Sequence, residues 1–561
     1  MSADLPSPLP GYRIAVAGDV AIDWLEYSTE PSGPPASGTM EARNWQRMAG
    51  TRMVTRPGGA LMLAQFIKCA TGARVLSQEL SGLEAIPPDE IVHSMATLAR
   101  YRRMPRSGEK DLVYRVDRFK GFAGPTQGKP RALQIVDDDP DADLVVLDDA
   151  GSEFRGDRAQ WPRALEEGKA PLIVLKMNSP LAHGQLWDWL VQVPPQRLIV
   201  VVAADDLRLE DVNLSRRLSW ERTAKDCVWQ MSANPKLAPL AKPGHLVVRF
   251  GLEGAMLFSR LASGLEARLF FDPKLAEDGF IDLNPGQMPG YAAAFVAALA
   301  SKVAAGGPEA VGEGVRHGLL AARRLHVRGF GPTMDGRDND CGPLFEADPS
   351  VDGHIADVVV PHRHETALSE TADPDYWCIL EEVTGPRLET VAFNTVVFGT
   401  DAAMEDVPMG QFRHLTTLDR SEIESFRSIR NLIREYLESP KNTRPLSIAV
   451  FGAPGSGKSF GVREVAQSVA PDRLKELELN VGRGLPGRRY GPPDRPGHLR
   501  LRRRDQHDAG RVLRRGLTTI DRPRGDSRSE ATVQERQGPR LRQSVAGLRQ
   551  HPWPQPDRDR R

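Results

Sequence analysis

Residues 446–470 read LSIAVFGAPGSGKSFGVREVAQSVA: a short apolar run, a glycine-rich turn and a stretch with helical periodicity. The turn matches the phosphate-binding pattern G-x-x-x-x-G-K-[ST] at every fixed position. Glycine lets backbone N–H groups turn inward, and the following helix adds free N–H groups and the positive end of its dipole. The sequence therefore predicts a phosphate site made by Gly452, Ala453, Pro454, Gly455, Ser456, Gly457, Lys458 and Ser459.

Two side chains of this turn predict the cofactors. Lys458 would neutralise the β- and γ-phosphates of a nucleotide, and Ser459 would place its hydroxyl on Mg²⁺. We therefore expect ATP and Mg²⁺ to bind here. The alternative is a glycine-rich turn between a strand and a helix that binds nothing.

The charge of the chain is unevenly distributed. The 561 residues have a formal net charge of zero, but residues 481–561 hold 21 Arg, no Lys and 9 acidic residues. The length predicts several domains. Four separated cysteines (Cys69, Cys227, Cys341 and Cys378) form no C-x-x-C pair. They predict a reduced, cytoplasmic protein without a disulfide or a zinc site. No signal peptide and no membrane-spanning run is found in the sequence.

Residues 1–330 predict an α/β domain. Residues 12–20 (YRIAVAGDV) read as a buried first strand, and residues 56–60 (RPGGA) as a turn that opens a helix. Further apolar strands alternate with helix-length segments, which indicates a parallel sheet sandwiched by helices. These strands are expected at residues 144–147, 172–175, 198–202 and 246–250.

Four pieces of this domain resemble the ribokinase-like (PfkB) carbohydrate kinases. They are the strand ending in Gly18-Asp19 with Asp23 after it, the turn at residues 57–60, the strand entering residues 148–151, and the late helix at residues 292–300. The resemblance implies a sugar or nucleoside site near the glycine turn. Asp19 and Asp23 could contact that ligand, or they could cap the first strand and the next turn.

The resemblance fails at the catalytic position. The family carries G-A-G-D before its late helix, and the matching stretch here is residues 290–295, GYAAAF. Ala293 stands where the family has its catalytic Asp, and alanine is no general base. Tyr291 would crowd the anion hole. We therefore expect a kinase fold without kinase activity.

Two patterns in this domain are given structural rather than functional interpretations. Residues 143–149 (DLVVLDD) look like a Walker B strand, but we expect a strand of the kinase-like sheet. A basic group near Ser215 is expected to form ion pairs on a solvated helical face. It comprises Arg208, Arg216, Arg217 and Arg222, interleaved with Glu210, Asp211 and Glu221.

Residues 331–372 read as a linker. Asp335, Asp338 and Asp340 lack the offsets of a calcium loop. Solvated loop histidines are expected rather than a metal site at His354, His362 and His364 with Glu365. Residues 373–397 predict a small packed element with a buried tryptophan, and residues 419–437 an amphipathic helix capped by Asp419 or Ser421. A helix before a P-loop strand resembles the beginning of AAA-type ATPase domains, so residues 373–481 are expected to hold the first part of one.

Residues 482–561 lack the Walker B strand and the sensor that such a domain needs. Three interpretations stay open for this segment. It could be a disordered basic tail that binds nucleic acid or an acidic partner, an out-of-frame translation of a truncated gene, or a divergent folded module.

The main expectation is an ATP-binding protein of the P-loop, AAA-like ATPase class that lacks visible elements for hydrolysis. The alternatives are a small-molecule kinase acting through residues 1–330, and a ligand-sensing scaffold without catalysis. Expected partners are a nucleotide and a second protein or another copy of the chain. Nucleic acid is expected only through the basic tail, and no membrane contact is expected.

Overall fold

The computed structural model describes residues 9, 11–28, 51–108, 110–125, 131–334, 340–361, 376–385, 388–439, 446–450, 457–469, 474–479, 498–503 and 517–519. Within these ranges, none of the helices has both the length and the apolar character that crossing a membrane requires. The boundaries that we predict for the four segments of the chain remain predictions.

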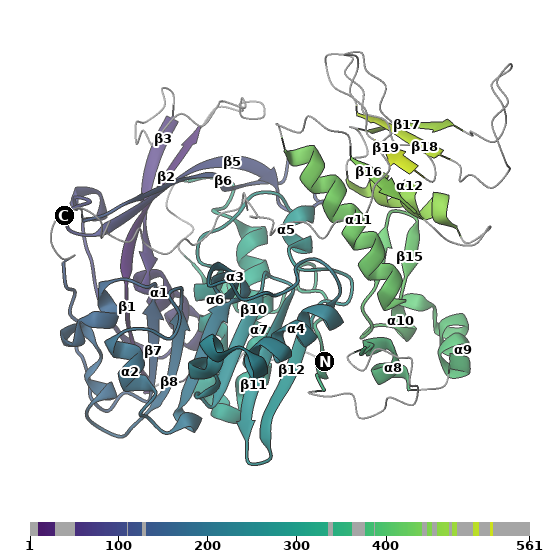
Figure 1. Cartoon of the computed structure of the whole chain (residues 1–561). Coiled ribbons are helices and arrows are strands. Elements are labelled where there is room, and N and C mark those ends of the chain that lie inside the picture. Colours follow the sequence, from purple (N-terminus) through teal and green to yellow (C-terminus); the bar gives the residue numbers. More distant parts are fainter. Residues whose placement is uncertain are drawn as a thin grey trace, which may run out of the picture.

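A nine-stranded sheet forms the body of the protein (Figure 1). Strands β4, β1, β7, β8, β9 and β10 run parallel, and β11, β12 and β13 extend one side in antiparallel fashion. The predicted α/β class and the four predicted strands are confirmed. The bounds across the sheet are β13 (Ala356–Val359), β12 (Gly264–Phe271), β11 (Gly254–Leu261), β10 (His245–Phe250), β9 (Leu198–Ala203), β8 (Leu172–Met177), β7 (Leu144–Asp149), β1 (Arg13–Gly18) and β4 (Arg74–Ser77).

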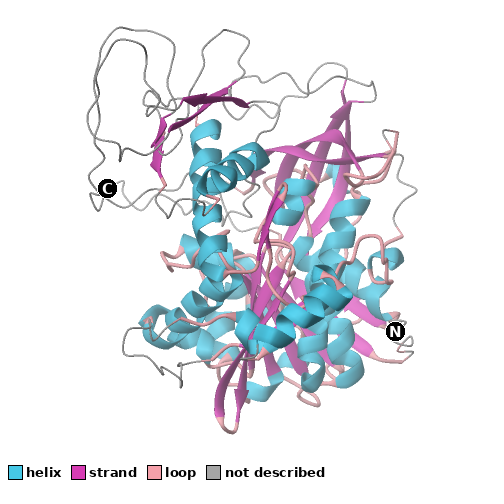
Figure 2. Ribbon diagram, turned by 90° about the vertical axis from the view of Figure 1, so that its right-hand side faces the viewer, coloured by secondary structure: helices cyan, strands magenta, loops and turns pink. Residues whose placement is uncertain are grey.

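Alternate residues of the strands enter two cores, one on each face of the sheet. Along β7, Leu144 and Val146 join one core, and Val145 and Leu147 join the other. Strands covered on both faces read as continuous apolar runs, which is why these strands were predictable. Helices lie on both sides of the strands in Figure 2. They are α1 (Ala60–Thr71), α6 (Tyr291–Gly306) and α7 (Val311–Arg328) over the first core, and α2 (Gln185–Leu190), α3 (Ala204–Leu209) and α4 (Trp220–Ala233) over the second.

A separate four-stranded sheet forms a lid at one end of the body (Figure 1). Its order is β3 (Thr51–Gly59), β2 (Val20–Ser28), β5 (Val92–Arg102) and β6 (Leu112–Ala123). The predicted turn at residues 56–60 is instead the end of β3, and α1 begins directly at Ala60. Gly59 makes this junction possible, because its φ is 58° and a Cβ there would lie 2.2 Å from the carbonyl oxygen of Asp19.

Residues after the body form a second group of elements. These are α8 (Ile379–Thr384), α9 (Leu388–Phe398), α10 (Thr400–Ala403), β14 (Gly410–Phe412), β15 (Leu415–Thr417), α11 (Arg420–Glu438), β16 (Ser447–Ala449), α12 (Lys458–Val469), β17 (Leu474–Leu479), β18 (His498–Arg503) and β19 (Leu517–Thr519). The helix predicted at residues 419–437 is confirmed as α11, and the Asp419 side chain caps it by accepting from the Glu422 N–H at 2.8 Å.

One polar stripe of α11 faces the body. Glu424 accepts from the Ser219 hydroxyl at 2.6 Å, and Arg427 donates to the carbonyl of Leu218. One and two turns further on, Asn431 donates to the carbonyl of Arg217, and Arg434 pairs with Asp282 at 2.8 Å. The apolar side of α11 packs instead on α12, through Ile433, Tyr436, Leu437, Val462 and Ala466. This helix therefore joins the body through polar contacts.

Segments expected to be linker or packed element contribute to the body. Residues 356–359 pair with β12 as strand β13, and Leu344 lies in the core that α6 and α7 cover. The predicted buried tryptophan is confirmed, because Trp377 is 2 % exposed and lies in the opposite core. His354 contacts Asp406 at 2.7 Å, and His362, His364 and Glu365 lie outside the described residues.

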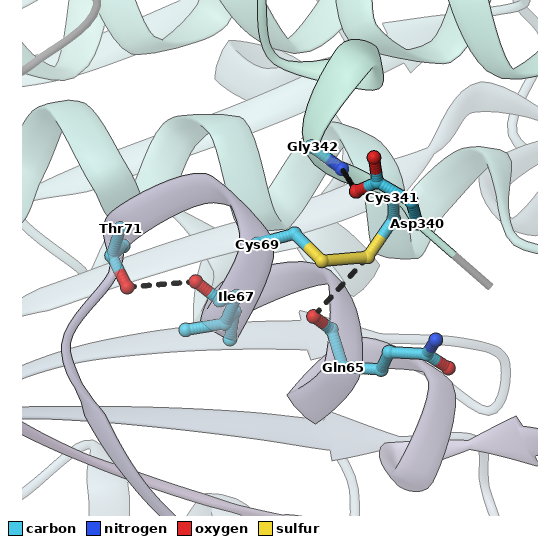
Figure 3. Close-up of a disulfide and its surroundings, with 7 residues drawn as sticks. All are labelled: Gln65, Ile67, Cys69, Thr71, Asp340, Cys341 and Gly342. Carbon is cyan, nitrogen blue, oxygen red and sulfur yellow. Dashed lines mark hydrogen bonds between the residues drawn. A yellow bond between two sulfur atoms is a disulfide. The ribbon is translucent and has the colours of Figure 1, made fainter.

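The expectation of a chain without disulfides is wrong. Cys69, near the end of α1, and Cys341 form a disulfide with a Cα–Cα distance of 5.8 Å (Figure 3). They are 272 positions apart in the sequence, so spacing gave no hint of the pairing. The fold joins them because the segment after α7 returns to the outer side of α1. Cys227 and Cys378 are buried free thiols.

Candidate ligand site

A cavity of about 220 Å³ lies between the lid and the carboxyl ends of the body strands. Ligands of open α/β sheets bind outside the carboxyl ends of the strands, because the loops there are free to diverge. Six polar side chains that line this cavity come from β1, β2, β5, β7 and β8 and the residues that follow them. They are Asp19, Asp23, Ser94, Asp148, Lys176 and Asn178.

Asp19 shapes the loop that follows β7. Its carboxylate accepts from the N–H groups of Ala150, Ser152 and Phe154 at 2.9 to 3.2 Å. Burial, and then the charge of Asp149, raises the pKa of Asp19 to about 7, while the backbone hydrogen bonds oppose that rise. The Asp19 side chain therefore fixes the loop after β7 rather than capping the first strand or the turn that follows it, and the same residue borders the cavity.

Asp23 presents a carboxylate from the lid. It accepts from the Ser94 hydroxyl at 2.5 Å, and burial raises its pKa while that hydrogen bond lowers it. Gly58 of β3 lies against this carboxylate, and a Cβ there would be 3.0 Å from Oδ1. The glycines of the RPGG stretch thus leave room for Asp23 and for the chain path at Asp19.

Lys176 and Asn178 supply the only amine and the only side-chain carboxamide of the six. The Lys176 ammonium pairs with Asp148 at 2.5 Å and donates to Asn178 Oδ1 at 3.3 Å. Sequence reading missed both, together with Ser94. Lys176 ends the run LIVLK just as Asp148 ends LVVLD, and two neighbouring parallel strands bring their carboxyl ends to one edge. That signal could have found Lys176.

The start of α6 forms another wall of the cavity. Gly290, Tyr291 and Ala293 line it, and the first helical bond runs from the Ala294 N–H to the Gly290 carbonyl. The N–H groups of Tyr291, Ala292 and Ala293 therefore precede the helix ladder at the positive end of its dipole. Ala293, the position at which the resemblance implies a catalytic Asp, faces the cavity without a carboxylate.

The remaining wall is apolar and partly aromatic. Phe119 and Phe122 of β6 meet edge to face with ring centroids 4.9 Å apart, and Met62 and Leu25 lie nearby on the lining. Phe122 is 39 % exposed, so it stands at the mouth. A second cavity of about 350 Å³ lies behind Met62, Met288 and Pro289, which line both spaces.

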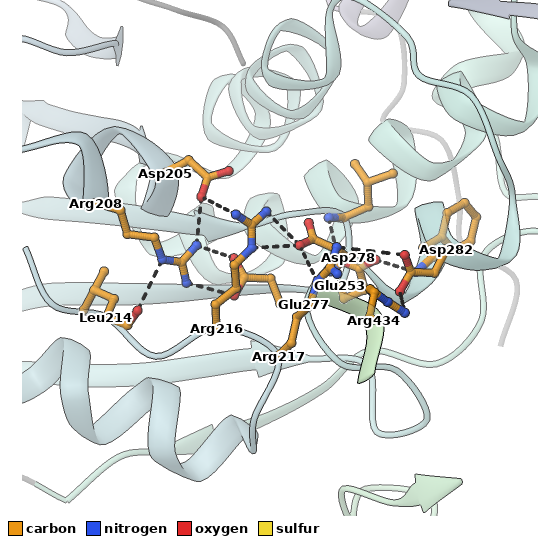
Figure 4. A network of polar contacts seen from close by, with 12 residues as sticks. Asp205, Arg208, Leu214, Arg216, Arg217, Glu253, Glu277, Asp278, Asp282 and Arg434 are labelled. Atoms are coloured by element: carbon orange, nitrogen blue, oxygen red, sulfur yellow. Dashed lines mark hydrogen bonds and ion pairs between the residues drawn. The ribbon is translucent and has the colours of Figure 1, made fainter. Parts of the chain in front are cut away.

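The basic group near Ser215 forms a buried network rather than a solvated helical face (Figure 4). Arg208 pairs with Glu277 through two bonds of 2.6 and 2.8 Å, and Arg216 and Arg217 both reach Asp278. The predicted ion pairs exist, but the partners are Asp205 and residues 277–282 rather than Glu210, Asp211 and Glu221. Arg222 alone remains at the surface, paired with Asp226. No spacing rule could supply Glu277 and Asp278, which lie 61 to 69 positions from the arginines they bind.

The predicted phosphate loop lies mostly outside the described residues. Those ranges include only Gly457, Lys458 and Ser459 of the eight predicted residues, and Gly452, Ala453, Pro454, Gly455 and Ser456 fall beyond them. Gly457 has a φ of 72°, and α12 begins at Lys458, close to where the helix was predicted. Phosphate binding by this loop, with Mg²⁺ on Ser459, stays a prediction.

The strands around this loop do not assemble as a P-loop ATPase requires. Such domains carry the loop between a helix and a strand of a parallel sheet. In the described part of the chain, β16 pairs only with β19 and β17 only with β18, and both pairs are antiparallel. The basic segment at residues 482–561 is described only at β18 and β19.

Neither family models nor curated proteins give a match to this sequence. Solved structures do. A ribokinase from Giardia lamblia is 13 % identical with a TM-score of 0.33, and the match covers 56 % of this chain and 94 % of that one. A putative phosphofructokinase from Staphylococcus aureus is 9 % identical with a TM-score of 0.32, covering 62 % and 98 %. A fructokinase from Vibrio cholerae is 13 % identical with a TM-score of 0.28, covering 55 % and 92 %.

The body and its lid form an α/β structure, a largely parallel sheet between two layers of helices with a separate four-stranded sheet. This confirms the predicted fold class of the first part of the chain. The expectation that the chain is principally a P-loop ATPase is wrong, because most of the described residues form the nine-stranded body and its lid, and the described strands on either side of residues 452–459 pair only in two-stranded antiparallel sheets. The motif at residues 452–459 led to the wrong main prediction because eight residues say nothing about the much larger α/β body, which fills most of the described chain.

Proposed function

We propose that the chain binds a sugar or a nucleoside in the lid cavity. The supporting observation is the combination of three carboxylates, the carboxamides of Asn178 and Gln287, and the Ser94 hydroxyl with an aromatic wall in about 220 Å³. Carboxylate and carboxamide oxygens accept from ligand hydroxyl groups, and a ring face packs well on Phe119. Lys176 is the single cation among the six polar side chains, so the lining favours a neutral, hydroxyl-rich molecule over an anion.

Asp23 offers the most direct test of this proposal. Its carboxylate is bonded by Ser94 alone among the described side chains, so it retains acceptor sites toward the cavity. A hydrogen bond from a ligand hydroxyl to a charged acceptor contributes about 1.5–3 kcal/mol. Asp23→Asn should therefore weaken binding by about 10- to 150-fold.

The test is calorimetry and thermal stabilisation with ribose, fructose, glucose, adenosine and cytidine. At least one should bind wild-type protein saturably and bind Asp23→Asn far more weakly. Asp117→Asn is the matched control, because Asp117 lies on β6 of the same four-stranded sheet and accepts from the Tyr101 hydroxyl outside the cavity. Failure of every probe, or equal affinity in wild type and Asp23→Asn, would overturn the proposal.

A second candidate function is phosphoryl transfer from ATP to the bound molecule. It is favoured by the free N–H groups at the start of α6, which suit a phosphate. The missing carboxylate at Ala293 opposes it. Within the described residues no group of three or more His, Cys, Asp or Glu side chains is placed to hold a metal ion, so no Mg²⁺ ligands are assigned.

Restoring the carboxylate tests this second candidate. A general base contributes about 10²- to 10⁴-fold to rate. Ala293→Asp should raise formation of a phosphorylated product from ATP and the bound sugar or nucleoside, measured by mass spectrometry. Ala293→Asn, which has the same size without a base, should not. Equal product from the two variants would exclude transfer at this site.

A further inference from the structure

Arg115 of β6 is a fully buried cation held by backbone carbonyls. Its Nε donates to the His326 carbonyl at 2.7 Å, its Nη1 to Pro285 and Arg102, and its Nη2 to Arg103 and Val327. The side chain is 0 % exposed, and no carboxylate pairs with it among the described residues. A buried guanidinium without a counter-charge is costly. These five carbonyls offset that cost and tie together the lid, the segment before α6 and the end of α7.

His326 continues the contact toward the cavity. Its Nε2 lies 2.7 Å from the Asn284 carbonyl, and its Nδ1 lies 2.6 Å from the Tyr291 hydroxyl. A carbonyl can only accept, so Nε2 carries the proton. Burial, and then the charge of Arg115, lowers the pKa of His326 to about 3, so the ring is neutral and Nδ1 accepts from the Tyr291 O–H.

Tyr291 closes the network at the cavity wall. Its oxygen accepts from the Met288 N–H at 2.8 Å, and its ring stacks on His326 with centroids 5.9 Å apart. Next to Met288, Gln287 exchanges two backbone hydrogen bonds with Val116, at 2.8 and 2.9 Å. Val116 follows Arg115 in β6, so the contacts form a closed ring. It runs from Arg115 in the lid through His326, Tyr291 and residues 288 and 287 of the body, and returns to the lid at Val116. Tyr291 does not simply crowd the start of α6, as its size predicted, because its hydroxyl is used to hold the preceding loop.

We propose that Arg115, His326 and Tyr291 are positioning residues that hold residues 284–291 and the first turn of α6 in the geometry needed to bind the cavity ligand. The inference rests on the proposed function for its ligand. Three observations support it: each hydrogen bond in the ring has a defined donor and acceptor, four of its residues line the cavity, and the ring crosses between lid and body. The cavity-lining members are Val116, Gln287, Met288 and Tyr291.

Tyr291→Phe removes the hydroxyl and keeps the stacked ring. The Met288 amide then loses its acceptor and the His326 Nδ1 loses its donor. We expect amide hydrogen exchange in the 284–291 segment to rise about tenfold or more in the ligand-free protein, and affinity for the sugar or nucleoside to fall about tenfold. Arg115→Lys offers three donors in place of five and should give a smaller loss of affinity than Arg115→Gln.

Tyr114→Phe is the matched control. Tyr114 is buried, lies next to Arg115 on β6, and donates its hydroxyl hydrogen to the Ser28 carbonyl away from the cavity. It should lower stability to a similar extent without raising exchange at residues 284–291 or weakening the ligand. Exchange in Tyr291→Phe that matches Tyr114→Phe would overturn the inference, as would unchanged affinity in Tyr291→Phe.

The two proposals fail in distinguishable ways. Exchange at residues 284–291 is measured without ligand, so it decides whether the network holds the loop even if no probe binds. If no probe binds wild-type protein, the proposed function falls, and faster exchange in Tyr291→Phe still supports positioning of the loop. If a probe binds wild type and both variants equally, the positioning role falls and the ligand site stands.

Discussion

Replacing Glu277 by glutamine should destabilise the protein by about 3–5 kcal/mol, because it leaves a buried guanidinium without its counter-charge. The Arg208 and Glu277 side chains are 14 % and 4 % exposed. Both carboxylate oxygens are engaged, Oε1 with Nη1 at 2.6 Å and Oε2 with Nη2 at 2.8 Å. Glutamine keeps one acceptor and turns an amide N–H toward the other guanidinium donor, so one charge-assisted bond becomes a repulsive contact.

The remaining partners of Arg208 compensate only in part. Asp205 accepts from Nη1 at 2.9 Å, but its side chain is 56 % exposed, so water screens that interaction. The Ser215 carbonyl also accepts from Arg208 and is neutral. Because these bonds are present in both wild type and Glu277→Gln, almost all of the lost stability comes from the pair between Arg208 and Glu277.

Urea unfolding at neutral pH measures the effect. Glu266→Gln is the matched control, because Glu266 also pairs with an arginine, Arg268, at 3.6 Å, but both side chains are 36 % exposed. Its loss should stay below about 1 kcal/mol. The double variant Arg208→Met with Glu277→Leu should recover most of the stability, since it removes both buried charges. A Glu277→Gln effect no larger than that of Glu266→Gln would refute the reasoning.

Three further outcomes are expected. Burial raises the pKa of Asp19 to about 7 and that of Glu253 to about 8, so the folded chain keeps protons that the unfolded chain releases near pH 4. Stability should therefore fall by about 1 kcal/mol as the pH rises from about 7.5 to 9, a range above the titration of unfolded histidines, and urea midpoints at the two pH values measure it. Cys69→Ser should cost about 2–5 kcal/mol, and dithiothreitol should reproduce the loss in wild type while leaving the variant unchanged. Arg434→Glu should speed protease cleavage around α11 with less than about 1 kcal/mol of global change, since Arg434 and Asp282 are 17 % and 29 % exposed. Adding Asp282→Arg should restore the slow cleavage.

The elements that sequence could predict are those whose signal is local. Strands β7 to β10 are apolar runs bounded by breakers, and α11 carries a 3-4 apolar spacing with an aspartate at its start. The lid strands β5 and β6 were missed because their residues are mixed: VHSMATLARYR and LVYRVDRFKGFA each combine buried and exposed positions. These two segments form strands because they pair with each other, and neither segment's own sequence reveals its partner.

The site shows the same division. Asp19, Asp23 and the glycines at residues 58–59 could be found because they adjoin a readable strand and turn. Ser94 carries no local signal, and the fold alone brings it beside Asp23, which is 71 positions away; Asn178 follows Lys176 by two positions and was missed with it. The disulfide and the Arg208 network join residues more than 60 positions apart, so their partners depend on the tertiary structure.

The bond between Cys69 and Cys341 also changes the topology of the molecule. It closes a covalent ring that contains β4 to α7, and every lining residue of the cavity belongs to this ring except Asp19 and the lining residues of β2, β3 and α1. A single cut anywhere in that ring opens it without releasing a fragment, and the cut chain runs as one species on a gel until it is reduced. Elements after Cys341, including α11, are not part of this covalent ring, so proteolysis there can remove them and leave the ring intact.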